Sequence, residues 1–316
     1  RRSWVSSTRF LPASAAAAPE SGEDRRWPDA CLAALLLAID PSGLKGAVLR
    51  AGPGPARERW LALLADRMGS ERPLRKMPAG IGDERLLGGL DLAATLRAGR
   101  PIAMTGLLGE AHGGLVVAAM AERMSGETAA RLALALDRGA IRPERTGAAE
   151  EVPTRLGLVM LDEGIEPEEA APAALTDRVA FAIDLTGYRG ALETEALPDG
   201  AALEEARRRL PDVAADEQAI ETLVHTAAAL GVASLRAPML ALRAARAMAA
   251  LDGRTAIETG DCALAARLVL APRATQIPAE AEDAPDEEPP PPEDGESDRE
   301  PDPPPDPKSG ETPEEI

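Results

Sequence analysis

The chain has 316 residues and a formal net charge of −18, from 35 Lys and Arg against 53 Asp and Glu. Residues 276–316 hold 16 of these acids, 2 of the bases and 12 of the 29 prolines, so the other 275 residues sum to only about −4. The length suffices for two ordinary domains with a substantial core. Because the near-neutral part carries no basic block, the composition excludes the usual kind of nucleic-acid binder.

Single residue types exclude further classes of protein. The longest apolar run, residues 31–39, is too short to span a bilayer. Cys31 and Cys262 lie far apart, which argues against a structural metal site and favours a reducing compartment, here the cytoplasm. His112 and His225 stand alone, so a His-rich metal site or a catalytic triad is excluded as well.

The first half of the chain predicts alternating strands and helices. Residues 1–25, rich in Ala, Ser and Arg, are expected to be a disordered leader rather than a targeting signal. A buried helix at residues 31–39 should stop at Asp40 and Pro41. A short strand at 46–49, a Gly/Pro cluster and a helix at 57–68 then form the opening of an α/β nucleotide-binding unit.

Three further strands are expected at residues 115–118, 156–161 and 179–185. A helix at 127–138, ended by Gly139, lies between the first two of them. Strands that alternate with helices predict an α/β fold with a doubly wound, mostly parallel sheet, here over residues 26–190.

After about Tyr188 the strand signals stop and the pattern becomes helical. Helices are predicted at residues 201–210, 216–230, 235–251 and 261–270, and Thr259 is the expected N-cap of the last one. Residues 191–275 are therefore expected to form a small helical domain. Residues 276–316 cannot bury apolar area and should be an extended, disordered linker, either a spacer or a docking segment for a basic surface.

Two Gly-rich segments allow a narrower comparison. Residues 88–101 read GGLDLAATLRAGRP and residues 106–114 read GLLGEAHGG. Together they resemble the GxLD…G…GLLxxAxxG pattern of the magnesium chelatase group of AAA+ proteins, as does the run LRAARAMAALDG at residues 242–253. The resemblance covers roughly residues 27–275 and implies an AAA+ core followed by a helical lid.

An AAA+ body that leads into a Pro-rich acidic linker resembles the D subunits of that group. In D subunits an integrin-I-like domain follows the linker. Residues 1–316 contain neither such a domain nor its DxSxS motif, so we expect this chain to correspond to the N-terminal part of a D subunit.

The resemblance implies a role in magnesium chelatase, a nitrogen–metal ligase that inserts Mg²⁺ into protoporphyrin IX on the route to chlorophyll and bacteriochlorophyll. It implies two partners, an I subunit that hydrolyses ATP and an H subunit that binds the porphyrin. ATP and Mg²⁺ are then used by the complex, and this chain would be a non-hydrolysing platform that pairs with the I subunit. The alternatives are an active ATPase of the MoxR-like type and a purely structural assembly scaffold.

The loop that should bind ATP is degenerate. An intact loop reads GxxxxGK[ST], because the glycines let backbone N–H groups wrap the phosphates while the Lys and the hydroxyl serve the phosphates and Mg²⁺. Here the corresponding positions are Gly52, Pro53, Gly54, Pro55, Ala56 and Arg57. Ala56 replaces the Lys, Arg57 replaces the hydroxyl and is a weak substitute for the lost positive charge, and the prolines remove two N–H donors.

The acidic motif is lost too. An apolar strand that ends in Asp-Glu would hold Mg²⁺ and orient water, but Ala119 and Met120 occupy these positions. The sensor position after the strand at 156–161 falls near Asp162 or Glu163, whose negative charge would repel a γ-phosphate. We therefore expect no metal site and no nucleotide bound in the usual mode.

Two arginines are the remaining candidates for chemistry. Arg178, in the segment LTDRV, matches the L-x-D-R-F segment of the family, in which the Arg reaches a neighbouring subunit's γ-phosphate. The alternative is a structural surface pair between Asp177 and Arg178. Arg236 stands at the sensor arginine position of the lid, for contact either with nucleotide or with a neighbouring subunit.

Overall fold

The computed structural model describes residues 24–142, 151–166 and 168–276. The expectations for leader residues 1–23 and linker residues 277–316 lie outside these ranges. All described residues belong to one compact unit, which contacts define as Arg1–Pro278. Within the described ranges, no helix is long and apolar enough to cross a membrane.

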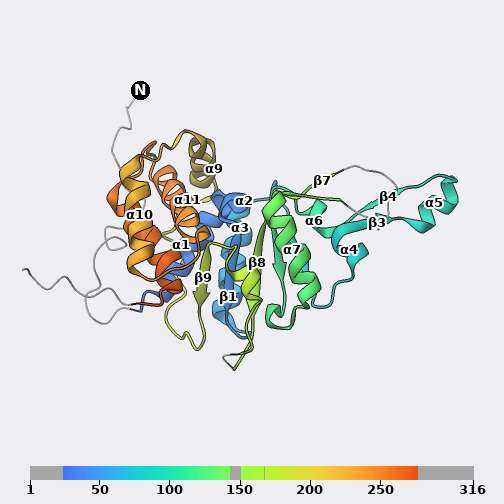
Figure 1. Ribbon diagram of the computed structural model, residues 1–316, viewed down its shortest axis with the longest axis horizontal. Coiled ribbons are helices and arrows are strands. Elements are labelled where there is room, and N and C mark those ends of the chain that lie inside the picture. Colours follow the sequence, from blue (N-terminus) through green and yellow to red (C-terminus); the bar gives the residue numbers. More distant parts are fainter. Residues whose placement is uncertain (1–23, 143–150, 167, 277–316) are drawn as a thin grey trace, which may run out of the picture. The chain divides into compact units, whose positions relative to one another are not determined.

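Five parallel strands form the central sheet (Figure 1), in the order β2-β5-β8-β1-β9. Their bounds are β2 (Leu74–Met77), β5 (Leu115–Ala118), β8 (Gly157–Asp162), β1 (Gly46–Arg50) and β9 (Phe181–Asp184). The predicted α/β class with a mostly parallel sheet is confirmed, as are its four predicted strands. The fifth strand, β2, is not predicted.

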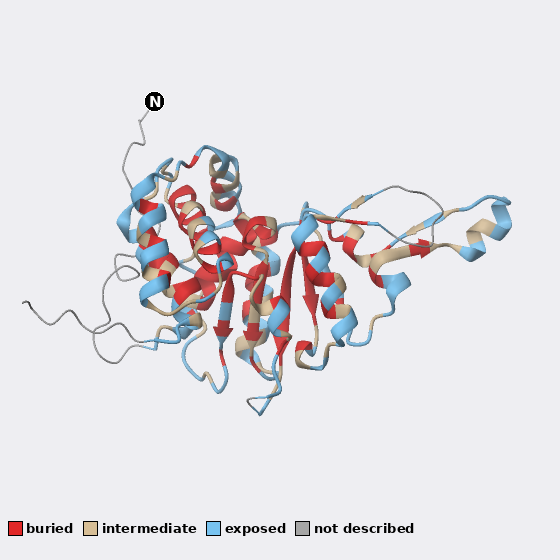
Figure 2. Ribbon diagram, in the orientation of Figure 1, coloured by how far each residue is buried: buried red, intermediate tan, exposed pale blue. Residues whose placement is uncertain are grey.

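Both faces of this sheet are covered, so its inner strands β5 and β8 are fully buried (Figure 2). Along β8, Leu158 and Met160 join the apolar cluster on one face, while Val159 and Leu161 join the cluster on the other. This alternation follows from the two-residue period of a strand. A parallel sheet with helices on both faces is the usual doubly wound arrangement.

Helices α1 (Arg26–Ile39) and α3 (Pro55–Met68) pack together on one face of the sheet. Helix α1 ends as predicted, because Pro41 begins the short helix α2 (Pro41–Leu44) and the Asp40 carboxylate caps it by accepting from the Gly43 N–H at 2.8 Å. On the other face, α7 (Gly126–Arg138) packs against α8 (Ala173–Thr176). Gly139 ends α7 in the left-handed conformation, φ 67°, as its position predicts.

The helical part consists of α9 (Gly200–Arg209), α10 (Glu217–Ala229), α11 (Arg236–Leu251) and α12 (Thr259–Ala265). A π-helical turn, Ala266–Leu270, continues α12, so the helix predicted at 261–270 is present in two parts. The predicted N-cap is wrong by one residue. Glu258 is the N-cap, because its side chain and that of Asp261 form a reciprocal capping box, and Thr259 is the first helical residue.

The sequence reading missed a hairpin that carries the family-like segments. It comprises β3 (Gly88–Leu90) and β4 (Ala103–Thr105), flanked by α4 (Asp83–Leu87) and α6 (Leu107–Glu110), with α5 (Leu92–Ala98) at its tip. A side chain at Gly106 would come within 2.1 Å of the Gly88 nitrogen, which explains the glycine there. A second small hairpin pairs β6 (Ala140–Ile141) with β7 (Val152–Pro153).

Candidate functional site

The loop between β1 and α3 lies at the carboxyl end of β1, between β8 and β9, and ligands bind at the carboxyl ends of strands in doubly wound folds. No heavy atom lies within 4 Å of the side-chain positions at Gly52 and Gly54, so this backbone faces open space. Pro55 is the first residue of α3 and Arg57 lies in its first turn. The predicted strand, Gly-rich loop and helix are therefore present, but the cation in the loop is an arginine.

Arg57 is already paired within the chain. Its Nη1 lies 2.5 Å from Oε1 of Glu163, the residue that follows β8. The Glu163 N–H in turn donates to Oε2 of Glu122 at 3.1 Å, and the Glu122 side chain is only 5% exposed. These contacts connect the β1–α3 loop, the segment after β5 and the segment after β8.

The two positions of the acidic motif lie next to this network. Ala119 and Met120 follow β5, and Met120 adopts a left-handed conformation with φ 49°. Asp162, one of the two residues expected at the sensor position, is buried and accepts from the Gly164 and Ala171 N–H groups at 3.0 Å each. It therefore organises the loop that it begins, while Glu163 is the acid that faces the β1–α3 loop.

These residues do not fit Mg²⁺-ATP, which the resemblance implies for such a loop. Ala56 offers no charge, Pro55 offers no N–H, and Arg57 is neutralised by Glu163. Within the described ranges, no group of three or more His, Cys, Asp and Glu side chains could hold a metal ion. His112 accepts from the Arg155 N–H at 3.1 Å, in keeping with a turn residue.

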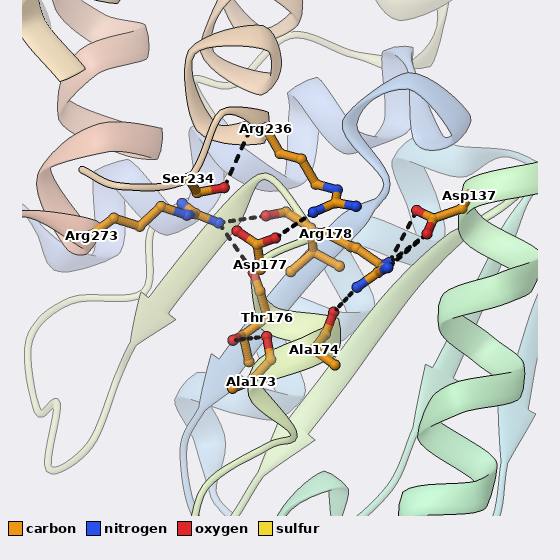
Figure 3. Close-up of polar contacts among 10 residues, drawn as sticks. Asp137, Ala173, Ala174, Thr176, Asp177, Arg178, Ser234, Arg236 and Arg273 are labelled. Atoms are coloured by element: carbon orange, nitrogen blue, oxygen red, sulfur yellow. Dashed lines mark hydrogen bonds and ion pairs between the residues drawn. The ribbon is translucent and has the colours of Figure 1, made fainter. Parts of the chain in front are cut away.

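Arg178 lies at the other end of the sheet, just before β9 (Figure 3). Its Nε and Nη2 donate to the two carboxylate oxygens of Asp137 at 3.0 and 2.7 Å, and its Nη1 donates to the Ala174 carbonyl at 2.6 Å. The alternative pair of Asp177 with Arg178 is not what the structure shows. Asp177 instead accepts from Arg236 Nη1 at 2.9 Å, so both candidate arginines lie in one region.

A half-buried arginine, Arg273, fixes the backbone beside them. Arg273 donates through Nη1 to the Ala180 carbonyl at 3.0 Å and through Nη2 to the Val179 carbonyl at 2.5 Å, as well as to Thr176 at 3.3 Å. Burial lowers the pKa of Arg273, but its carbonyl partners favour the charged form. These bonds hold the segment that carries Arg178 in one conformation.

Arg178 and Arg236 line a pocket of about 160 Å³ with two further cations, Lys45 and Arg243. The other lining residues are Gly43, Leu136, Asp137, Met239 and Leu240. Lys45 Nζ donates to the Leu136 carbonyl at 2.6 Å. Within the described residues, Arg243 makes one ion pair, at 4.0 Å to Asp40.

The electrostatics of this cationic pocket centre on Asp137. The hydrogen bond from Arg178 lowers the pKa of the Asp137 carboxyl, and the charges of Arg236 and Lys45 act in the same direction. Burial, and then the like charge of Arg243, lowers the pKa of Lys45. Asp137 is the one acid in the lining, and Asp177 and Asp40 pair with Arg236 and Arg243 from outside it. Four cations therefore face three carboxylates, and the positive charge in excess can attract a further anion.

Sequence reasoning missed Lys45, Asp137 and Arg243. Asp137 lies in the last turn of α7, where a negative charge is unfavourable for the helix dipole, and this position is a usable signal that it needs a cationic partner. Arg243 follows Arg236 by seven residues on α11, which places both on the same helix face. Lys45 has no comparable signal. It occupies a left-handed turn, φ 64°, where the sequence would lead one to expect a glycine.

The cationic pocket and the β1–α3 loop lie at opposite ends of one strand. Lys45 immediately precedes β1, whereas the loop of Arg57 follows it. Five residues of strand separate the two by about 17 Å. Within one chain, Arg178 and Arg236 therefore cannot reach a ligand held by the β1–α3 loop.

Known proteins resemble this chain in sequence and in fold. A family model described as the AAA lid domain matches residues 220–293. The crystal structure of a Cytophaga hutchinsonii protein provisionally named an ATPase matches 77% of this chain and 81% of its own, with a TM-score of 0.57 and 16% identity. The latter shows the fold alone. The lid match, together with the sequence relatives below, defines the class: the chain belongs to the AAA+ superfamily.

Sequence relatives define the group within that class. The chain is 44% identical over 262 residues to the magnesium-chelatase 60 kDa subunit of Cereibacter sphaeroides, and 33% identical over 281 residues to the 67 kDa subunit of Chlorobaculum tepidum. These matches cover 83% and 82% of this chain. The chain is thus a homologue of the magnesium-chelatase 60 and 67 kDa subunits, as the Gly-rich segments predict.

The matches cover most of this chain but less than half of each relative. The chain spans 43% of the Cereibacter sphaeroides subunit and 45% of the Chlorobaculum tepidum subunit. The 38 kDa magnesium-chelatase subunit of Rhodobacter capsulatus is a more distant relative, 26% identical over 65% of both chains. The AAA+ body is therefore shared between the larger and the smaller subunit types.

Proposed function

We propose that this chain works in the cytoplasm as a subunit of a magnesium chelatase complex, in which ATP hydrolysis drives insertion of Mg²⁺ into protoporphyrin IX for chlorophyll or bacteriochlorophyll. In this complex it is an AAA+ platform that does not itself hydrolyse ATP. Its identity to the 60 and 67 kDa subunits supports the complex, and the replaced loop residues support the lack of hydrolysis. Mg²⁺ enters the reaction as substrate, and ATP is held by a partner.

One observation supports a role of Arg178 and Arg236 towards another chain: the cationic pocket lies a full strand away from the β1–α3 loop of the same chain. An anion bound there must come from solution or from another chain. Leu235 and Met239, which are 87% and 64% exposed, lie beside Arg236 at the start of α11. Large exposed apolar side chains next to charges are typical of a protein interface.

The partner on this surface is the 38 kDa AAA+ subunit, which shares the AAA+ body. A nucleotide held at the carboxyl end of its sheet would present phosphates to Arg178. There the guanidinium would stabilise the charge that builds up on the transferred phosphoryl group, a contribution worth about 10³–10⁵ in rate in the GTPase case. Arg236 has an interface role beside it, and the porphyrin is bound by a third subunit.

The experiment replaces Arg178 in the complete complex, assembled from this chain and its cognate partner subunits. With Arg178→Ala we expect ATP hydrolysis and chelation to fall by about 10³, while gel filtration still shows assembly. The matched control is Arg208→Ala, because Arg208 is an exposed arginine of α9 paired with Glu205. Unchanged hydrolysis and chelation in the Arg178 variant would disprove the arginine-finger role.

A second candidate is an assembly scaffold with no role at any ATP site. The saturated hydrogen bonding of Arg178 by Asp137 and Ala174 favours it, because a structural arginine shows the same contacts. The two functions differ in one measurement. A scaffold loses hydrolysis only in proportion to lost assembly, whereas a finger variant loses hydrolysis in the assembled complex.

A further inference from the structure

The ion pair between Arg57 and Glu163 neutralises the cation next to the β1–α3 loop with an acid of the same chain. It joins the first turn of α3 to the residue after β8, with side chains that are 15% and 28% exposed. The pair thus neutralises the guanidinium that a phosphate in this loop could otherwise contact.

Glu163 is held in this position by its neighbours. Its N–H donates to the nearly buried Glu122 carboxylate. The next residue, Gly164, accepts at 3.0 Å through its carbonyl from Arg50 Nη2, and its N–H donates to Asp162. The backbone on both sides of the carboxylate is therefore fixed, so that Glu163 stays next to Arg57.

We propose that Glu163 is the residue that excludes phosphate-bearing anions from the β1–α3 loop. It neutralises Arg57, the cation in the first turn of α3 that directly follows the open backbone of Gly52 and Gly54. The proposal rests on the proposed function in that the chain holds no nucleotide of its own. It adds that one acid, and not only the lost Lys and hydroxyl, keeps the site closed.

The test removes the charge of Glu163 and measures anion binding to the full chain. We expect Glu163→Gln to bind inorganic pyrophosphate at least about tenfold more tightly than the unmodified chain, by isothermal titration calorimetry at low salt, because the Arg57 guanidinium is released to a charge-assisted hydrogen bond. The double variant Arg57→Gln/Glu163→Gln should return to the unmodified affinity. MgATP is the second probe and should show the same order.

The matched control is Glu166→Gln, which makes the same change of charge in the same loop. Within the described residues, the Glu166 side chain makes no hydrogen bond or ion pair, while its carbonyl accepts from Arg50 and from the Glu169 N–H. Equal pyrophosphate affinity of the Glu163 and Glu166 variants would overturn the inference, as would a gain that persists without Arg57. Glu163→Ala provides a second variant, and thermal melting checks that each variant is folded.

The outcomes separate the two proposals. If neither the unmodified chain nor Glu163→Gln binds pyrophosphate or MgATP, this inference fails while the proposed function stands. If the unmodified chain binds MgATP as tightly as the Glu163 variant, Glu163 excludes nothing, and the platform without its own nucleotide fails as well. A gain that needs both the loss of Glu163 and the presence of Arg57 supports the inference.

Discussion

The two ends of strand β1 carry the same kind of residue in opposite electrostatic states. At the carboxyl end, Arg57 forms a half-buried pair with a single acid. At the amino end, Arg178 shares a pocket with three more cations and one lining acid, Asp137. Even with Asp177 and Asp40 counted, the amino end keeps one positive charge in excess, whereas the Arg57 pair is neutral. The difference indicates that the first end is closed within the chain and the second retains charge for something outside it.

The largest expected effect comes from replacing one arginine by alanine at each end of β1. In the assembled complex, Arg178→Ala should lower ATP hydrolysis by about 10³, whereas Arg57→Ala should change it by less than about twofold, because in the proposed function the loop of Arg57 holds no nucleotide. Steady-state phosphate release measures both. A comparable loss in both variants would contradict the functional contrast between the ends.

The ion pairs at the two ends of β1 should also differ, by a smaller amount, in how much they contribute to the free energy of unfolding. A double-mutant cycle on Arg57 and Glu163 should give a coupling of about 1–2 kcal/mol, because these side chains are mostly shielded from water. The cycle on Arg236 and Asp177, which are 49% and 32% exposed, should give about 0–0.5 kcal/mol. Urea unfolding of the purified chain yields both values, and equal couplings would refute the contrast.

Asp137, at the amino end of β1, should make the stability of the chain depend on pH. Arg178 lowers the folded-state pKa of Asp137 below its unfolded value of about 3.9. The stabilisation is therefore fully present above that pH and is lost as the pH falls through the folded-state pKa. Thermal melts of the unmodified chain and Asp137→Asn should differ by a constant amount from pH 7 to about 5 and converge below about 4. A difference that grows on acidification would contradict this assignment.

How far the sequence predicted the molecule depends on whether a feature is local. Strands β5, β8, β1 and β9 were predictable because apolar runs mark the strands of a parallel sheet that is covered on both faces. β2 was not, because it is a short edge strand whose middle residues, Arg75 and Lys76, are exposed. The hairpin that carries α5 was missed because its helix buries no residue, which leaves no apolar period to find.

The candidate sites show the same division. The loss of the ATP loop residues at Ala56 and Arg57 could be stated from position alone. The pair of Arg57 with Glu163 joins residues 106 positions apart, and each residue was interpreted separately, one as a weak cation and the other as a repulsive charge. Arg178 and Arg236 were predicted, but the pocket that unites them needs Lys45 from the start of β1, which only the tertiary fold brings there.

The smallest expected effect tests whether the cationic pocket acts as a whole. Arg243 makes one long ion pair within the described residues, so Arg243→Gln should leave the melting temperature of the chain nearly unchanged. Its charge still adds to the field of the pocket. We therefore expect two- to fivefold weaker association with the proposed 38 kDa partner at low salt, roughly what one partly screened charge contributes, and no difference at high salt. Arg208→Gln, on the exposed face of α9, is the control. A loss that persists at high salt would show that Arg243 acts through packing, and the comparison between the two ends of β1 would then rest on Arg178 alone.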